Sequence, residues 1–259
     1  METPLYQIDA FTDRPFSGNP AGVCPLEAWL EDSEMQNIAT ENNLPETAFF
    51  VKNGDGYDLR WFTPTVEIDL CGHATLASAF VIMNYIDSRT PGVVFSTRSG
   101  ELRVKKEDNL FIMDFPSQPP VPCDTPGDLV AGLDIRPKEV LKSQDYLVVV
   151  EGEEDVRDLA PDFERLKRLD LRGIIVTAPG SNADFVSRFF APGIGINEDP
   201  VTGSSHCTLI PYWSKRLGRK KLHALQLSPR GGELFCEMHE DRVMIAGRCA
   251  LYMEGTISL

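Results

Sequence analysis

The feature that most constrains the fold is an internal repeat of three short landmarks, which occur in the same order in each half of the chain. Each set has an aromatic-proline segment, then a glycine followed by a polar residue, then a Gly-Glu-Leu segment. The first set is Phe62-Thr-Pro64, Gly72-His73 and Gly100-Glu101-Leu102, and the second is Phe190-Ala-Pro192, Gly203-Ser204 and Gly232-Glu233-Leu234. Their offsets are 128, 131 and 132 residues. One spacing shared by three ordered landmarks predicts two half-chains of one architecture.

We place the two halves at residues 1–117 and 118–259, with terminal strands that can cross between them and with Pro116–Pro126 as the linker. Both halves consist mainly of short segments rich in β-branched and aromatic residues, bounded by turn residues. The expected strands are Tyr6–Phe11, Glu46–Lys52, Tyr57–Phe62, Val93–Thr97, Glu101–Lys105, Leu110–Phe115, Tyr146–Val150, Gly173–Thr177, Phe185–Phe190, Leu222–Leu227, Leu234–Met238 and Val243–Gly247, and the expected surface helices are Glu31–Asn42 and Pro161–Arg168. Strands of this length and spacing favour an α+β fold with barrels or sandwiches.

Each half also contains one central helix. The segment Ala74–Ile86 is apolar on all sides apart from Thr75, Ser78 and Asn84. A helix of this kind is buried on all sides, and a sheet wrapped around it is the simplest way to achieve that. Its counterpart, Ser204–Leu217, is polar in its first turn, and we expect Pro211 to kink or interrupt it.

Charge and hydropathy exclude several kinds of partner. The formal net charge is −14 and the sequence pI is about 4.7. Nucleic-acid binding needs clustered basic residues, and the only dense basic stretch is Lys215–Lys221, so we expect no nucleic-acid partner. The most apolar stretch, Ala74–Ile82, is about half the ~20 residues that a bilayer span requires, so we expect no membrane association.

The cysteines and histidines follow no metal-binding pattern. The six cysteines lie far apart without a C-x-x-C pair, which is typical of free thiols in a reducing compartment and predicts a cytoplasmic protein. The four histidines show neither H-E-x-x-H nor zinc-finger spacing, so we predict no metal site. No P-loop or dinucleotide-binding motif occurs either, so nucleotide and dinucleotide cofactors have no sequence signature.

Both predicted central helices begin with a glycine and a polar residue, Gly72-His73 and Gly203-Ser204. The first backbone N–H groups of a helix have no partner inside the helix and lie at the positive end of its dipole. Such a helix start binds carboxylates and other anions well. The alternative is that both are ordinary helix starts, with glycines that serve only tight turns.

Ionisable side chains gather around these helix starts in the sequence. His73 follows Gly72, Asp199 precedes Gly203, and Glu46 stands just before a strongly apolar run. A carboxyl group at the edge of an apolar environment suits proton transfer at neutral pH. Structural alternatives stay open: Glu46 as an exposed strand-end charge, Asp199 as a turn residue before a proline, and His206 as a polar residue of the first helical turn.

Several spaced motifs together resemble the phenazine-biosynthesis PhzF-like family. They are Ile8-Asp-Ala-Phe11, Gly18-Asn-Pro20, Asn43-Leu-Pro-Glu46-Thr-Ala-Phe49, Phe62-Thr-Pro64, Gly72-His-Ala-Thr75 and Asp199-Pro-Val-Thr-Gly-Ser204. The motifs occur in the family's order over residues 8 to 204. The resemblance implies the fold of diaminopimelate epimerase, in which two similar halves each wrap a β-barrel around a central helix and the active site lies in the cleft between them.

The resemblance also implies roles for individual residues. Glu46 matches the family's proton-carrying glutamate, and His73 and Asp199 match its polar site residues. The positions expected to bind substrate are Asn19, Gly72, Gly203 and Ser204. The implied reaction moves a proton between carbons of a small amino- or hydroxy-carboxylate without metal or organic cofactor, and the implied assembly is a homodimer.

Two departures from the family pattern keep other functions open. Pro45 stands before Glu46, where a serine is common in the family, so the phenazine substrate itself is not expected. Cys71 stands where diaminopimelate epimerase has one of its two catalytic thiols, and the other thiol position is occupied by Thr202. A thiol-assisted amino-acid epimerase or racemase with Cys71 as a second base is therefore one alternative. The structural alternative for Cys71 is a small buried residue that packs at the helix start. A second alternative is a small-molecule binding protein without catalysis, because a fold does not by itself imply an activity.

Overall fold

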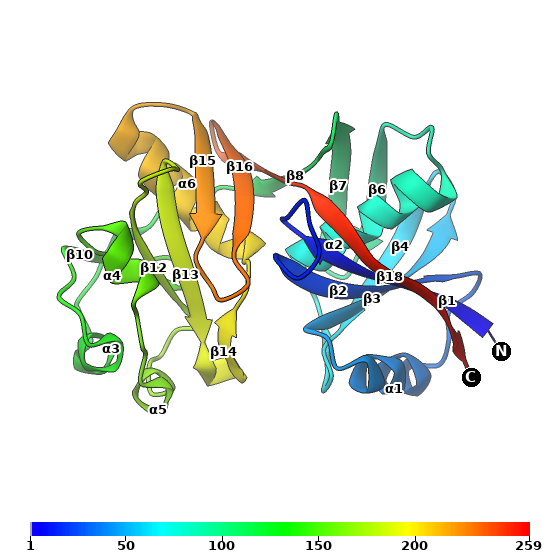
Figure 1. The fold of residues 1–259 in the computed structure, drawn as a ribbon, viewed down its shortest axis with the longest axis horizontal. Coiled ribbons are helices and arrows are strands. Elements are labelled where there is room, and N and C mark those ends of the chain that lie inside the picture. The colour runs from blue at the N-terminus through cyan, green and yellow to red at the C-terminus, as the bar shows by residue number, and fades with distance from the viewer. Residues whose placement is uncertain (1) are drawn as a thin grey trace. The chain divides into compact units, whose positions relative to one another are not determined.

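The computed structural model describes residues 2–259 and divides into two compact units (Figure 1). Unit 1 contains the chain up to Asp114 together with Ala246–Leu259, and unit 2 contains Phe115–Ile245. The C-terminal segment lies in unit 1 because it pairs with the first strand of the chain, and this is the crossing of a terminal strand that the prediction allows. The structure combines parallel and antiparallel strands with a few helices, which confirms the predicted α+β class.

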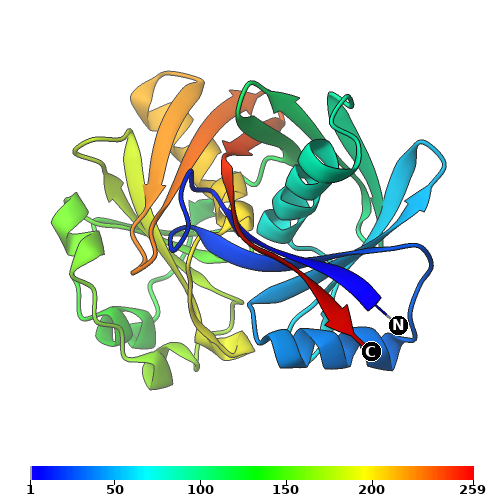
Figure 2. The same ribbon diagram turned by 45° about the vertical axis from the view of Figure 1, so that its right-hand side comes forward.

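Unit 1 places its N- and C-terminal strands side by side (Figures 1 and 2). Its elements are β1 (Glu2–Ala10), β2 (Asn19–Leu26), α1 (Asp32–Asn42), β3 (Glu46–Asn53), β4 (Gly56–Phe62), β5 (Glu67–Ile68), α2 (Gly72–Val81), η1 (Ile82–Ile86), β6 (Gly92–Thr97), β7 (Gly100–Glu107), β8 (Leu110–Pro116) and β18 (Cys249–Ser258). Strand β1 pairs with β18 and β2, β2 runs parallel to β3, β3 is antiparallel to β4, and β4 is parallel to β6. The unit boundaries fall inside β8 and β17.

Helix α2 is the buried helix that the sequence predicts. It packs against β1, β2, β3 and β18, and nearly all of its residues are buried. Two of its polar side chains form hydrogen bonds to the backbone four residues earlier. The Thr75 hydroxyl donates to the Cys71 carbonyl, and the Ser78 hydroxyl donates to the Ala74 carbonyl. The α-helix ends at Val81, and the predicted continuation to Ile86 is the π-helical turn η1.

Unit 2 repeats the strand pairing of unit 1. Its elements are β9 (Val121–Pro122), α3 (Gly127–Leu133), β10 (Glu139–Lys142), β11 (Tyr146–Val149), α4 (Glu153–Arg157), α5 (Phe163–Leu166), β12 (Ile174–Pro179), β13 (Phe185–Ala191), η2 (Pro192–Ile194), β14 (Ile196–Asp199), α6 (Gly203–Leu217), β15 (Lys221–Gln226), β16 (Gly232–His239) and β17 (Arg242–Gly247). Strand β11 is parallel to β12, β12 is antiparallel to β13, β13 is parallel to β15, and β15 is antiparallel to β16. The order parallel, antiparallel, parallel, antiparallel is the order that β2, β3, β4, β6 and β7 follow in unit 1.

The sequence landmarks fall at equivalent elements of the two units. Gly72 and Gly203 each begin a central helix, and Gly100 and Gly232 each begin the second strand of a hairpin. Helix α6 contacts β15 and β16 and runs from Gly203 to Leu217 with Pro211 inside it. Of the two predicted effects of Pro211, an interruption of the helix is therefore excluded, and a kink stays a prediction.

Each unit has a hydrophobic core under its surface helices. In unit 1, Met35 and Ile38 of α1 pack on Phe49 and Phe62 of the sheet. In unit 2, α3, α4 and α5 cover the apolar side of β11, β12 and β13. Within residues 2–259, no helix combines the length and apolar composition needed to cross a bilayer.

Candidate active site

Three ionisable side chains meet at the start of α2 in unit 1. Oε2 of Glu46 lies 2.9 Å from Nε2 of His73, and Sγ of Cys71 lies 3.6 Å from Nδ1 and 4.0 Å from Nε2 of the same ring. Glu46 is the first residue of β3, Cys71 is the N-cap of α2, and His73 belongs to its first turn. The packing of α2 against β3 therefore brings together side chains that are distant in the sequence.

The cluster is almost completely removed from solvent. Glu46 is 7% exposed, and Cys71 and His73 are each 6% exposed. The apolar strand that follows Glu46, which includes Phe49 and Phe50, anchors the carboxyl group at the edge of the core. The prediction of an apolar setting for Glu46 is confirmed, and an exposed strand-end charge is excluded.

Asn19 fixes the histidine ring from the other side. It is the first residue of β2, is completely buried, and its Nδ2 lies 3.2 Å from Nδ1 of His73. The ring is thus held between the Asn19 amide at Nδ1 and the Glu46 carboxylate at Nε2. In the structure the Asn19 amide contacts the histidine, and the substrate contact expected for Asn19 stays a prediction.

Burial and charge act against each other in this cluster. Burial alone would lower the pKa of His73, but interactions with Cys71 and with the Glu46 carboxylate raise that pKa well above its ordinary value. Burial, followed by the charge of Glu46, raises the pKa of the Cys71 thiol to about 11. At neutral pH the thiol is therefore protonated, and Glu46 and His73 form an ion pair.

The same three residues carry a donor set for a metal ion. One donor atom from each of Glu46, Cys71 and His73 lies within 4.8 Å of the other two. Spacing rules for the sequence miss this group because its donors come from a strand and a helix start rather than from one recognisable motif.

In unit 2, Asp199 belongs to a hydrogen-bond network at the start of α6. Its Oδ2 accepts a hydrogen bond of 2.6 Å from the hydroxyl of Thr202, the N-cap residue. Gln226 of β15 accepts from the Thr202 backbone N–H at 2.9 Å and donates to the Asp199 carbonyl at 2.8 Å. The carboxylate is thus held in one orientation at the end of β14, and Gln226 is a contributor that sequence reasoning missed.

Ser204 contacts a second group that the sequence did not reveal. Its Oγ accepts a hydrogen bond of 3.2 Å from Nη2 of Arg172. The guanidinium of Arg172 is held by Asp145 through two hydrogen bonds of 3.0 and 2.7 Å, and Asp145 is only 2% exposed. A buried carboxylate that accepts two hydrogen bonds from one guanidinium fixes the orientation of the arginine side chain. The pair spans 27 residues of sequence, which is why no local motif signals it.

The pKa of His206, the histidine of α6, shifts in the opposite direction to that of His73. His206 is completely buried, its Nδ1–H donates to the Thr202 carbonyl at 2.8 Å, and its ring lies beside Phe185. Its Nε2 has no hydrogen-bond partner among the described residues. Burial lowers the pKa of His206 to about 4, so the ring is neutral at physiological pH.

Both glycine-opened helix starts are present as predicted. Neither N-cap residue, Cys71 or Thr202, uses its side chain to cap its helix within the described chain. The first backbone N–H groups of both helices, from Gly72 and from Gly203, are therefore available to bind an anion. That the two helix starts share one ligand stays a prediction.

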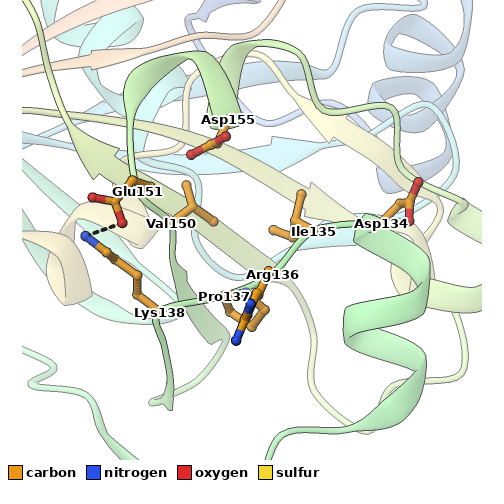
Figure 3. Close-up of a pocket in the computed structure, with 8 residues that line it drawn as sticks. All are labelled: Asp134, Ile135, Arg136, Pro137, Lys138, Val150, Glu151 and Asp155. Carbon is orange, nitrogen blue, oxygen red and sulfur yellow. Dashed lines mark ion pairs between the residues drawn. The ribbon is translucent and has the colours of Figure 1, made fainter.

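A cavity of about 590 Å³ in unit 2 contains none of these residues (Figure 3). Its lining alternates in charge, with Asp134, Glu151 and Asp155 near Arg136 and Lys138, and Lys138 forms an ion pair of 2.5 Å with Glu151. Exposed ion pairs of this kind are weak because water screens them. The cavity therefore offers no argument for a second catalytic centre.

Comparison with known proteins decides the family. Residues 8–255 match the family PhzC-PhzF, described as phenazine biosynthesis-like protein. The chain belongs to this phenazine biosynthesis-like family. Two Pseudomonas aeruginosa proteins, each named an uncharacterized isomerase, are 55% and 53% identical over the whole of both chains. A crystal structure of a PhzF family protein from Enterococcus faecalis superposes with a TM-score of 0.98, at 50% identity and full coverage of both chains.

The family membership confirms the resemblance that the sequence motifs indicate. The relatives named as isomerases cover the complete chain, so the protein is an isomerase of this family. The chemical roles of individual residues are a separate question, which the geometry of the two helix starts addresses.

Proposed function

We propose that the protein moves a proton between carbons of a small amino- or hydroxy-carboxylate, with Glu46 as the proton carrier and no bound cofactor. The observation that carries this proposal is a buried carboxylate beside an ionisable histidine, Oε2 to Nε2 2.9 Å. A positioned carboxyl group of this kind performs general acid/base catalysis.

The proposed reaction balances within the pair of substrate and Glu46. The carboxylate of Glu46 takes a proton from one carbon as that C–H bond breaks, and the electron pair delocalises into the substrate. The new carboxyl group then gives the proton to a second carbon, which restores the ionised Glu46. His73, held by Asn19, stabilises the carboxylate form and orients it during both steps.

Substrate binding is assigned to the helix starts. The backbone N–H groups at Gly72 in unit 1, and those at Gly203 with the hydroxyl of Ser204 in unit 2, are each suited to hold a carboxylate and the negative charge that develops on it. Asp199, oriented by Thr202, supplies a fixed acceptor for an amino or hydroxyl group of the substrate. A small carboxylate with such a group fits this set of donors and acceptors.

The finer architecture and assembly belong to the same proposal. Each unit is a β-barrel wrapped around its central helix, which the repeated strand pairing and the burial of α2 and of most of α6 support. The proposed homodimer follows from the family resemblance, and the proposed cytoplasmic location follows from the free cysteines.

A thiol mechanism is the second candidate, and one contact favours it. Sγ of Cys71 lies 3.6 Å from Nδ1 of His73, so an epimerase with Cys71 as a second base is geometrically available. Against it stands the pKa of about 11, which leaves very little thiolate at neutral pH. A binding protein without catalysis is the third candidate.

Incorporation of solvent deuterium separates the three candidates. Small cyclic and linear amino- and hydroxy-carboxylates are incubated with the protein in D₂O, and exchange at carbon is followed by mass spectrometry. We expect exchange that is lost in Glu46→Gln and retained in Glu41→Gln, a matched change on the exposed side of α1. Loss in Cys71→Ser with retention in Glu46→Gln would favour the thiol mechanism, and binding without exchange would favour the binding protein.

A further inference from the structure

The cluster of Glu46, Cys71 and His73 has a chemical property beyond proton transfer. It combines a carboxylate oxygen, a thiol sulfur and an imidazole nitrogen, all within 4.8 Å of one another and all buried. This mixture of oxygen, sulfur and nitrogen donors suits Zn²⁺ and similar borderline ions, whereas Mg²⁺ and Ca²⁺ prefer oxygen alone.

The distances are close to those of a tetrahedral site. Bond lengths to zinc of about 2.0–2.3 Å place tetrahedral ligand atoms about 3.4–3.6 Å apart. Oε2 and Nε2 lie 2.9 Å apart, and Sγ and Nε2 lie 4.0 Å apart, so each of these two separations needs to change by about 0.5 Å. The carboxylate oxygen and the sulfur, the third pair, lie within 4.8 Å of each other.

One of the donor atoms lacks a hydrogen bond. Oε2 of Glu46 is buried and has no hydrogen-bond partner among the described residues, although Nε2 of His73 is within ion-pair distance. A coordinating cation would stabilise a buried carboxylate oxygen that lacks a hydrogen bond, because it offsets the cost of removing that oxygen from water. Asn19, next to the far side of the ring, provides the outer contact that ligating histidines commonly have.

We propose that Glu46, Cys71 and His73 bind a Zn²⁺-type ion, and that the bound ion inhibits the isomerase. Binding forms metal–oxygen, metal–sulfur and metal–nitrogen bonds and releases to solvent the proton of the Cys71 thiol and the proton on Nε2 of His73. Three protein ligands leave a fourth position for water. The ion occupies the carboxylate that would otherwise carry the proton, so the inhibition rests on the proposed function, whereas the binding rests on the donor geometry alone.

Cobalt binding tests the site directly. Full-length protein is treated with chelator and a phosphine reductant, exchanged into chelator-free buffer and titrated with Co²⁺, which gives a near-ultraviolet charge-transfer absorption when a thiolate coordinates it. We expect one Co²⁺ per chain with this absorption and displacement of Co²⁺ by Zn²⁺. Cys71→Ser should abolish the absorption and weaken binding by more than the about 10–100-fold that loss of a supporting outer contact costs.

The controls separate this site from adventitious thiol binding. Cys123 is a partly exposed thiol outside the cluster, so Cys123→Ser should leave the absorption unchanged. Absence of the absorption in the parent protein, or its loss in Cys123→Ser instead of Cys71→Ser, would overturn the inference.

Deuterium exchange then tests the inhibition. Stoichiometric Zn²⁺ should suppress exchange and chelator should restore it, and unchanged or faster exchange with the site filled would overturn the inhibitory role. A cobalt site in a protein whose exchange survives Glu46→Gln would refute the proposed function but leave the metal site standing. Exchange that needs Glu46 in a protein without the cobalt absorption would refute the metal site alone.

Discussion

The two central helices begin in the same way but surround their first turns with different chemistry. Helix α2 opens with Gly72 beside a buried ion pair, Glu46 and His73. Helix α6 opens with Gly203 beside a network in which Thr202 binds Asp199 and Gln226. The same scaffold thus carries a buried ion pair in unit 1 and a network of hydrogen bonds in unit 2.

The two buried histidines show the difference most clearly. His73 faces a carboxylate, which raises its pKa against the effect of burial. His206 faces a backbone carbonyl and the ring of Phe185, so burial dominates and lowers its pKa. Equal burial therefore gives opposite charge states, because only one ring has an ionised neighbour.

The largest effect should come from removal of the proton carrier in unit 1. Glu46→Gln keeps the shape of the side chain but cannot take a proton from carbon. Exchange of substrate protons should fall by about 10²–10⁴-fold, the usual contribution of general acid/base catalysis. Rates of deuterium uptake measure the loss, and thermal unfolding verifies that the variant is folded. A loss below tenfold would show that Glu46 is not the proton carrier, and unit 1 would then have no catalytic role that unit 2 lacks.

The second prediction concerns stability against pH in unit 2. The folded-state pKa of His206 is about 4, below the ordinary value of 6.5. Between those values the unfolded chain binds a proton that the native chain does not, so this contribution to stability is complete above pH 6.5 and is lost progressively as pH falls toward 4. It amounts to about 2 kcal/mol between pH 7 and pH 5.

Urea unfolding at pH 7 and pH 5 measures this contribution by difference. His206→Asn keeps a donor near the Thr202 carbonyl but does not titrate, so its stability should vary less between the two pH values than that of the parent. If the stability of parent and variant depended equally on pH, His206 would not have the lowered pKa that distinguishes it from His73.

A third, smaller effect should come from Ser204. Ser204→Ala removes the hydroxyl that Arg172 contacts and that we propose holds the substrate carboxylate; a hydrogen bond to a charged group contributes about 1.5–3 kcal/mol. We expect the KM to rise by about tenfold or more while kcat stays near the parental value, the pattern of lost ground-state binding. Ser204→Thr retains the hydroxyl and should recover most of the affinity. A fall in kcat with unchanged KM would assign proton chemistry to unit 2 as well.

The smallest effect should come from Asn19. Asn19→Ser removes the amide that holds Nδ1 of His73, and one hydrogen bond contributes about 1 kcal/mol, so kcat should fall by about fivefold. The pH dependence of kcat should shift, because the ring nitrogen Nδ1 loses its contact with the amide. An unchanged pH profile would leave Asn19 with only a packing role.

Much of the fold follows from local patterns in the sequence. The strand at Glu46, the hairpin at Gly100 and both central helices lie where periodicity and turn residues predict them. Strand β2 was missed because Pro20, Gly22 and Pro25 are unfavourable in strands, yet its backbone pairs with both β1 and β3. Strand β18 was missed because its sequence has no clean alternation, and β1 provides the pairing that defines it.

The site was predictable in part. Glu46, His73 and Cys71 could be nominated from helix-start chemistry and the family motifs, and they do lie together. The Arg172–Asp145 pair and Gln226 could not, because their roles arise from tertiary contacts between distant strands and loops. Pattern reasoning finds residues attached to a local structural signal, and it misses partners that only the fold brings near.

A histidine titration by NMR tests the central contrast most directly and needs no substrate. The Cε1–H resonances of the four histidines are followed against pH, with His73→Gln and His206→Asn to assign the two buried rings. The account predicts that His73 titrates well above 6.5 and that His206 stays neutral down to about pH 4. If both rings titrate near 6.5, or if their order is reversed, the ion pair of Glu46 and His73 is not the charged centre of the molecule.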